Sequence, residues 1–285
     1  MKVAELHAES WRRLQEWKGR LPHALLISGA KGLGKLDLAL DFAASLLCEE
    51  TGHDGAACGA CPACQWLEKG NHPDFRLLQP EALQREEEEG GKEEKKQGRG
   101  KESGEEKSNR KGQEIGVDDV RALDAFLSVG THRQKMRVIL VHPAEAMNRH
   151  AANALLKALE EPPSDTLFML VSNEPMRLLP TLRSRCQQLA LPVPSASLAE
   201  RFLCERSAVP SKGGTAQKPF SDAATWLALA GGAPMLALRL SESAAAWRDI
   251  FLDLLQRGER LEVIAAAASL EKELKAVKGE NPLPE

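Results

Sequence analysis

The sequence contains no tyrosine, and aromatic residues make up only 4% of its 285 residues. Its 38 lysines and arginines nearly balance 41 acidic residues, so the formal net charge is −3. This balance excludes a bulk polycation, and any contact with nucleic acid must come from a local patch. Modules that bind single-stranded nucleic acid stack bases on aromatic side chains, so the scarcity of aromatics counts against a zinc-dependent module of that kind.

The sequence also lacks the run of about 18 apolar residues that a membrane-spanning helix needs. The nearest candidate, residues 223–238, is interrupted by Gly231, Gly232 and Pro234. The first 17 residues are amphipathic and carry acids, which is unlike a secretory signal, so we expect a cytoplasmic protein. In that compartment, six cysteines favour a metal site or plain thiols over a disulfide framework.

Short apolar runs alternate with helical patterns along most of the chain. The runs typical of buried strands are residues 23–28, 74–78, 137–141, 167–171 and 187–191. Helical periodicity follows Lys35 and Val117, and Asn148 is a suitable cap for a helix that Pro162 and Pro163 would end. This alternation predicts an α/β domain over residues 1–192, with a mostly parallel sheet between helices.

Two stretches fall outside this pattern. Residues 81–114 contain 11 acidic and 9 basic residues among 34, with only Ala82 and Leu83 apolar, and they cannot bury enough surface to offset the entropy of ordering. We predict a disordered surface insertion there. After Pro194 only helical patterns remain, which predicts a helical lid over residues 193–242. Residues 243–285 would then form a short C-terminal helical collar, either truncated or unusually small.

A glycine-rich turn follows the first predicted strand and fits the P-loop pattern G-x-x-x-x-G-K. Its residues are Gly29, Gly32, Gly34 and Lys35. Such a loop directs backbone N–H groups at a phosphate, and its lysine reaches the terminal phosphates. The next position should be Ser or Thr to bind magnesium, but it is Leu36. We therefore predict a degenerate site that binds nucleotide idly or not at all, which leaves ATP and magnesium doubtful as cofactors.

The acid that completes such a site is also missing. It belongs at the end of a buried strand, where it holds magnesium and positions water. The expected strand, residues 137–141, is followed by His142 and Pro143, and Glu145 lies too far along the chain to be counted on. Two independent losses predict that the chain does not hydrolyse ATP itself.

Four cysteines are spaced as a metal site over residues 48–64. Two overlapping C-x-x-C steps follow a more distant first cysteine, giving the set Cys48, Cys58, Cys61 and Cys64. Four thiolates suit tetrahedral structural zinc and leave no open position for catalysis. Reduced, unligated thiols are the alternative, and His53 and His72 are treated as bystanders. Zinc would contribute roughly 10 kcal/mol or more to local folding.

Arg185 lies in the sequence Ser184-Arg185-Cys186, just before the last predicted strand. An arginine supplied to a neighbour's γ-phosphate stabilises transition-state charge. An isolated arginine is far more often a surface salt-bridge partner. Only the other motifs of the chain therefore favour a role for Arg185 at a neighbour's γ-phosphate.

Taken together, these motifs resemble the clamp-loader subunits of bacterial DNA polymerase III, which belong to the AAA+ class. The resemblance covers residue 21 to about residue 240, apart from the charged insertion. It rests on the P-loop, the four cysteines, residues 153–163 (NALLKALEEPP), Ser172 with Asn173, and residues 181–186 (TLRSRC). It implies a RecA-like α/β domain, a small helical lid and a collar that joins five subunits in a ring.

The resemblance also implies roles. In this family the gamma and tau subunits hydrolyse ATP, and a non-hydrolysing subunit donates the arginine of the Ser-Arg-Cys motif, here Arg185. Asn173 falls at the first sensor position, and residues 232–236 lack the second-sensor arginine. The implied partners are gamma/tau and delta subunits, the sliding clamp and primed DNA. Such a subunit serves DNA replication as a non-catalytic part of a DNA-directed DNA polymerase, a nucleotidyltransferase. The alternative is an active gamma/tau-type ATPase, against which Leu36 and His142 count.

Overall fold

The structure, a computed structural model, describes residues 2–50, 52, 55–83, 112–128, 136–207 and 223–241. The predicted collar and all but the edges of the charged insertion lie outside these residues. At the two edges of the insertion, the described residues include helical ones, at 81–83 and at 112–113.

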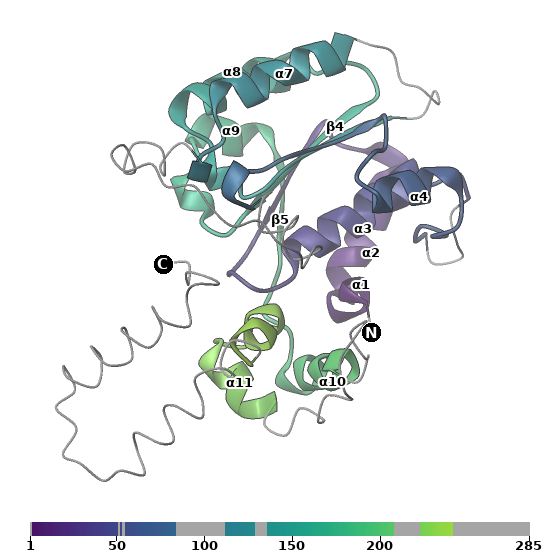
Figure 1. The fold of residues 1–285 in the computed structure, drawn as a ribbon, viewed down its shortest axis with the longest axis vertical. Coiled ribbons are helices and arrows are strands. Elements are labelled where there is room, and N and C mark those ends of the chain that lie inside the picture. The colour runs from purple at the N-terminus through teal and green to yellow at the C-terminus, as the bar shows by residue number, and fades with distance from the viewer. Residues whose placement is uncertain are drawn as a thin grey trace, which may run out of the picture.

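Five parallel strands form one sheet in the order β2-β3-β4-β1-β5 (Figure 1). They are β1 (Ala24–Ser28), β2 (Phe75–Leu78), β3 (Arg137–Val141), β4 (Thr166–Ser172) and β5 (Gln187–Ala190). All five predicted strands are confirmed to within one or two residues. In the sheet, β1 lies between β4 and β5. The loop that follows β1 leaves the sheet at its carboxyl edge, where ligands bind in open α/β sheets.

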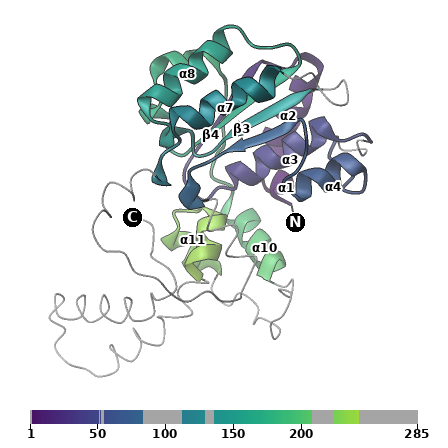
Figure 2. The same cartoon turned by 45° about the horizontal axis from the view of Figure 1, so that its top comes forward.

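Helices cover both faces of this sheet (Figure 2). One face carries α1 (Val3–Leu6), α2 (Ala8–Trp17) and α3 (Lys35–Leu47). The other carries α7 (Val117–Ser128), α8 (Arg149–Glu160) and α9 (Pro180–Arg185). Side chains alternate along β1 accordingly: Leu25 and Ile27 face the first layer, whereas Ala24 and Leu26 face the second.

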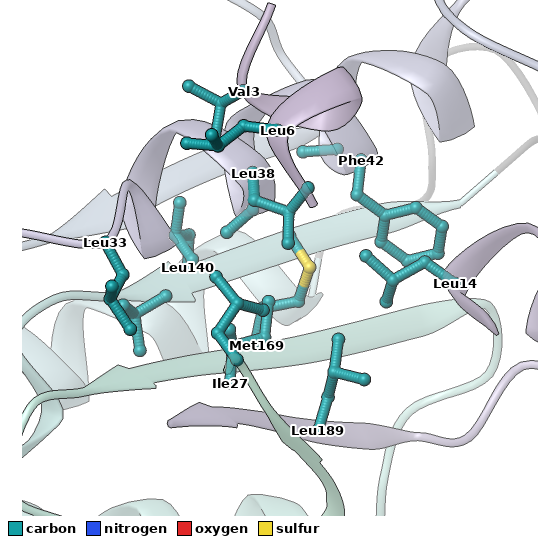
Figure 3. Close-up of a cluster of buried hydrophobic side chains, with 14 of the residues drawn as sticks. Val3, Leu6, Leu14, Ile27, Leu33, Leu38, Phe42, Leu140, Met169 and Leu189 are labelled. Carbon is teal, nitrogen blue, oxygen red and sulfur yellow. The ribbon is translucent and has the colours of Figure 1, made fainter. Parts of the chain in front are cut away.

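The larger of the two cores lies between α3 and the sheet (Figure 3). Leu38 and Phe42 from α3 pack with Leu140 and Met169, and all four are fully buried. Trp11 from α2 meets the Phe42 ring edge-on at 6.4 Å between centroids. Each such side chain stabilises the fold by about 1.5–3 kcal/mol relative to an exposed one, so α3 and the P-loop before it are firmly held.

The helix signals read from the sequence act as expected. Asn148 caps α8, with its Oδ1 accepting from the backbone N of Ala151 at 2.9 Å, and α8 ends at Glu160 before the two prolines. The other helices are α4 (Pro62–Glu68), α10 (Ala196–Ser207), α11 (Ala223–Leu229) and an unlabelled helix, Pro234–Ser241. Short 3-10 turns are η1 (Lys18–Arg20), η2 (Ala144–Ala146) and η3 (Pro175–Arg177).

Among the described residues, no single helix is both long and apolar enough to cross a membrane. Only Ala223–Leu229 and Pro234–Ser241 taken together meet the length and composition required, and they are bent by 108° relative to each other.

Candidate functional site

The P-loop connects β1 to α3, and its carbonyl oxygens bind the side chain of its own lysine. Gly32 and Gly34 both have a φ of +82°, a conformation that glycine adopts without strain. Lys35 donates from Nζ to the carbonyl oxygens of Gly29 at 2.8 Å and Ala30 at 2.5 Å. Only 3% of Lys35 is exposed. Its ammonium group therefore serves the loop that would cradle a phosphate.

The outer side of the loop is covered by two other parts of the chain. His7, between α1 and α2, donates from Nε2 to the carbonyl of Leu33 at 2.7 Å. From the helix Pro234–Ser241, the backbone N of Met235 donates to the carbonyl of Gly32 at 2.9 Å. A Cβ added at Gly32 would lie 2.5 Å from Cβ of Leu236, which shows how closely this helix approaches the loop. The first helices and the helix Pro234–Ser241 are therefore packed on the loop.

Glu145 lies beside Asn173 at the carboxyl edge of the sheet. The turn η2 carries it back to the end of β4, where its Oε1 accepts from the backbone N and from Nδ2 of Asn173, both at 3.0 Å. It does not occupy the position of the acid that ends the strand, which is His142 followed by Pro143. The structure therefore pairs Glu145 with Asn173, and no carboxylate directly follows β3.

Burial controls the charges around this pair. Desolvation lowers the pKa of Lys35 to about 8, and the nearby charge of Glu145 opposes that shift. Desolvation also lowers the pKa of His142 to about 4, with Glu145 opposing and Lys35 adding to the effect. His142 is therefore neutral at pH 7 and cannot replace the missing carboxylate.

Arg185 lies at the last position of α9 and is held at the surface. Its Nη2 lies 2.7 Å from Oε1 of Glu160, at the end of α8, and its Nη1 donates to the carbonyl of Thr181 at 3.1 Å. The side chain is 36% exposed. The guanidinium is thus positioned by two contacts while part of it faces solvent.

The four cysteines come together as the spacing predicts. Their sulfur atoms all lie within 4.8 Å of one another, with 3.8 Å between Cys48 and Cys61 and 4.0 Å between Cys58 and Cys64. Sulfurs bound tetrahedrally at about 2.3 Å from zinc are about 3.8 Å apart, so the set fits that metal. Backbone N–H groups of Cys58 and Cys61 also donate to neighbouring sulfurs at 3.3 Å, as thiolate ligands require. The group can hold a metal ion.

A mixed-charge groove of about 710 Å³ lies on the opposite layer, between α7 and α8. Lys157 lines it. The other charged or titratable side chains in its lining are Arg121, Asp124, His150 and Glu161. The lining is therefore not a uniformly basic patch.

Three contacts around these sites carry no signal in the sequence: His7 with Leu33, Glu145 with Asn173 and Glu160 with Arg185. Their members are 26, 28 and 25 residues apart. No periodicity or cap signal links positions so distant, because only the packing of separate elements brings them together. Only the acidic character of the two glutamates could have suggested them.

The fold and the site together define the class of protein: a AAA+ domain with a RecA-like parallel sheet, a P-loop after β1 and a four-cysteine module. The chain belongs to the family described as DNA polymerase III, delta subunit, whose model matches residues 7–195. It is 40% identical over 218 residues to the DNA polymerase III delta′ subunit of Pseudomonas aeruginosa, covering 76% of this chain and 55% of that one. It is 37% identical over 188 residues to the delta′ subunit of Bacillus subtilis, covering 65% and 47%.

The chain thus spans about half the length of the curated relatives it matches. Among solved structures, it is similar to a DNA polymerase III gamma subunit-related protein from Thermotoga maritima. That match has a TM-score of 0.45 and 18% identity, covering 95% of this chain and 79% of the other.

Proposed function

We propose that this chain acts as a delta′ clamp-loader subunit that does not hydrolyse ATP and donates Arg185 to the ATP site of a neighbouring gamma or tau subunit. The observation that carries the proposal is a contrast within one domain. The P-loop lysine bonds its own loop, whereas Arg185 is held partly exposed at the surface.

Several features of the chain's own site support the absence of hydrolysis. Leu36 replaces the magnesium-binding hydroxyl, and His142 with Pro143 replaces the acids. Residues 232–236 carry no arginine, and Met235 and Leu236 there pack against the loop instead. In this proposal Gly29, Gly32, Gly34, Lys35 and Asn173 are remnants of a nucleotide site.

The proposed partners are gamma/tau and delta subunits in a ring of five, with the sliding clamp and primed DNA bound by the complex. In this proposal residues 1–192 form the AAA+ domain, residues 193–242 the lid and residues 243–285 the collar through which subunits join. A subunit with this role in DNA replication would work in the cytoplasm. Any contact with the duplex would follow its phosphate backbone and weaken with salt.

We also propose that the four cysteines hold structural zinc. The site lies between the end of α3 and the start of α4, and its four sulfurs would complete a tetrahedral shell. Zinc would fix the loop between these helices and take no part in chemistry.

ATP turnover by the assembled complex tests the arginine. Matching gamma/tau and delta subunits, with clamp and primed DNA, are assayed with no addition, with this chain and with its Arg185→Ala variant. We expect the chain alone to be silent and to stimulate the complex. Arg185→Ala should remove this stimulation, because an arginine finger is worth about a thousandfold or more at its site.

Arg183→Ala is the matched control, since Arg183 lies on the same helix and its Nη1 contacts Sδ of Met176 instead. It should leave stimulation within about twofold. Unchanged turnover with Arg185→Ala would remove the finger role. Turnover by this chain alone would favour an active gamma/tau-type subunit.

A further inference from the structure

Glu160 and Arg185 end two helices that pack against each other on one face of the sheet. Glu160 is the last residue of α8, and Arg185 is the last residue of α9. A chain neighbour of each is buried in the same core: Leu159 is 2% exposed and Cys186 is 8% exposed. Because core packing fixes the backbone at both positions, the two side chains project from fixed points and meet at the surface.

The contacts of Arg185 use only part of its hydrogen-bonding capacity. Its Nη2 donates to Oε1 of Glu160 at 2.7 Å, and its Nη1 donates to the carbonyl of Thr181 at 3.1 Å. A guanidinium group is a planar fork with five N–H donors. Acceptors on two different helices therefore fix the plane of the fork. The side chain is 36% exposed, so the donors that these contacts do not use can serve a group from outside the chain.

We propose that Glu160 is a positioning residue for Arg185: its carboxylate holds the guanidinium in the orientation from which the unused donors reach the γ-phosphate of a neighbouring subunit. This inference rests on the proposed role of Arg185 and adds the residue that orients the arginine before the subunits meet. Glu160 touches neither the nucleotide nor the reacting atoms, and it acts only through Arg185.

Preorganisation is the physical reason for such a contact. A long side chain that is not held in place loses rotamer entropy when it binds, whereas a donor already in place needs no reorganisation at the moment of reaction. A misplacement of about 1 Å can lower a rate by about a hundredfold. An exposed ion pair contributes little to stability. Loss of Glu160 should therefore lower turnover and leave the folding stability nearly unchanged.

ATP turnover by the complex of gamma/tau and delta subunits, with clamp and primed DNA, tests the proposal. The complex is titrated with the parent chain, with Glu160→Ala and with Glu160→Gln. We expect Glu160→Ala to lower the maximal stimulation about tenfold, while the chain concentration that gives half of the maximal stimulation stays within about twofold. Glu160→Gln should retain roughly half or more of the stimulation, because its amide oxygen can accept the same hydrogen bond.

Glu174→Ala is the matched control. Glu174 is also exposed, at 60%, and its Oε1 lies 3.6 Å from Nη1 of Arg177, so this variant removes the same charge from an arginine that has no proposed role. It should leave stimulation within about twofold, and both alanine variants should keep the Tm of the parent within about one degree. The double variant Glu160→Ala/Arg185→Ala should equal Arg185→Ala, because Glu160 has no effect once its partner is absent.

The possible failures are distinguishable. If Arg185→Ala loses stimulation and Glu160→Ala keeps it, the positioning role is overturned and the proposed function stands. If Arg185→Ala keeps stimulation, both are overturned. Higher turnover with Glu160→Ala would show that the carboxylate restrains the arginine, and a change in half-saturation alone would assign Glu160 to assembly; either result overturns the proposal. Should Glu160→Ala unfold early, Glu160→Asp replaces it, since it keeps the charge but is one methylene shorter.

Discussion

At the residue scale, the site depends on how burial changes the charge of single groups. Lys35 and His142 are both polar, and both have lowered pKa values chiefly because they are desolvated. Lys35 retains a role within the loop through its two carbonyl contacts. His142 supplies no charge at pH 7, because its pKa is lowered to about 4.

The lowered pKa of Lys35 makes stability depend on pH. The folded chain releases this proton near pH 8, whereas the unfolded chain keeps it up to the ordinary value of 10.5. Between these values the unfolded state binds more protons, so stability rises with pH. We expect the Tm of the parent minus that of Lys35→Met to increase by about 2 °C or more from pH 7 to pH 10, which is roughly the effect of 1 kcal/mol. Subtracting the variant cancels the titration of other groups, and a flat difference would contradict the assignment.

At the element scale, the four-cysteine module joins α3 to α4 and also contacts the N-terminal helices. Lys18 in η1 donates from Nζ to the carbonyl of Gly55 at 2.7 Å and of Ser45 at 3.3 Å. A Cβ added at Gly55 would clash with Oε1 of Gln15, from α2. The loop that carries the cysteines is therefore packed on α2, and its order affects more than itself.

Metal content and stability test this element. Cys61→Ser should lose bound zinc and lower the free energy of unfolding by about 2 kcal/mol or more, because three ligands no longer complete the shell. Cys204→Ser is the control, since Cys204 is exposed on α10 away from the cluster, and it should keep both zinc and stability. Elemental analysis and urea unfolding provide the two readouts. A parent protein without zinc would defeat the prediction.

At the scale of the whole molecule, the lid and the sheet domain meet on the P-loop. Gly32 is the contact point, since its backbone bonds Met235 and its Cα lies against Leu236. In Figure 1 the lid helices α10 and α11 lie below the sheet, on the same side as the N-terminus. The helix Pro234–Ser241 is thus packed directly on the P-loop.

Two glycine substitutions distinguish the destabilisation caused by crowding at this contact from the destabilisation caused by backbone strain. Gly32→Ala places a Cβ 2.5 Å from the Leu236 side chain, whereas Gly70→Ala has a similar φ of +70° and meets nothing within 4 Å. Both substitutions carry the cost of a positive φ, but only the first also overpacks the interface. We expect Gly32→Ala to lose about 1–3 kcal/mol more than Gly70→Ala in urea unfolding. Equal losses would show that the lid does not press on the loop in solution.

Local sequence signals predicted most of the fold. The five strands, the cap at Asn148 and the helix stop before Pro162 depend on residues adjacent in the chain, so periodicity and cap chemistry were sufficient. The same holds for the cysteine cluster, whose members lie within 17 residues. The predictions for residues 243–285 and for most of residues 81–114 stay predictions, and composition gave no sign of the helical residues at 81–83 and 112–113.

By itself, then, the sequence determined the class of fold, the P-loop with its missing magnesium ligand, and the four-thiol set. Tertiary structure alone decided that Glu145 meets Asn173, that Glu160 holds Arg185 and that His7 and Leu236 close the loop. The physical reason is distance along the chain. A strand or a cap forms from neighbours in sequence, whereas these contacts exist only after the packing of separate elements has brought remote segments together.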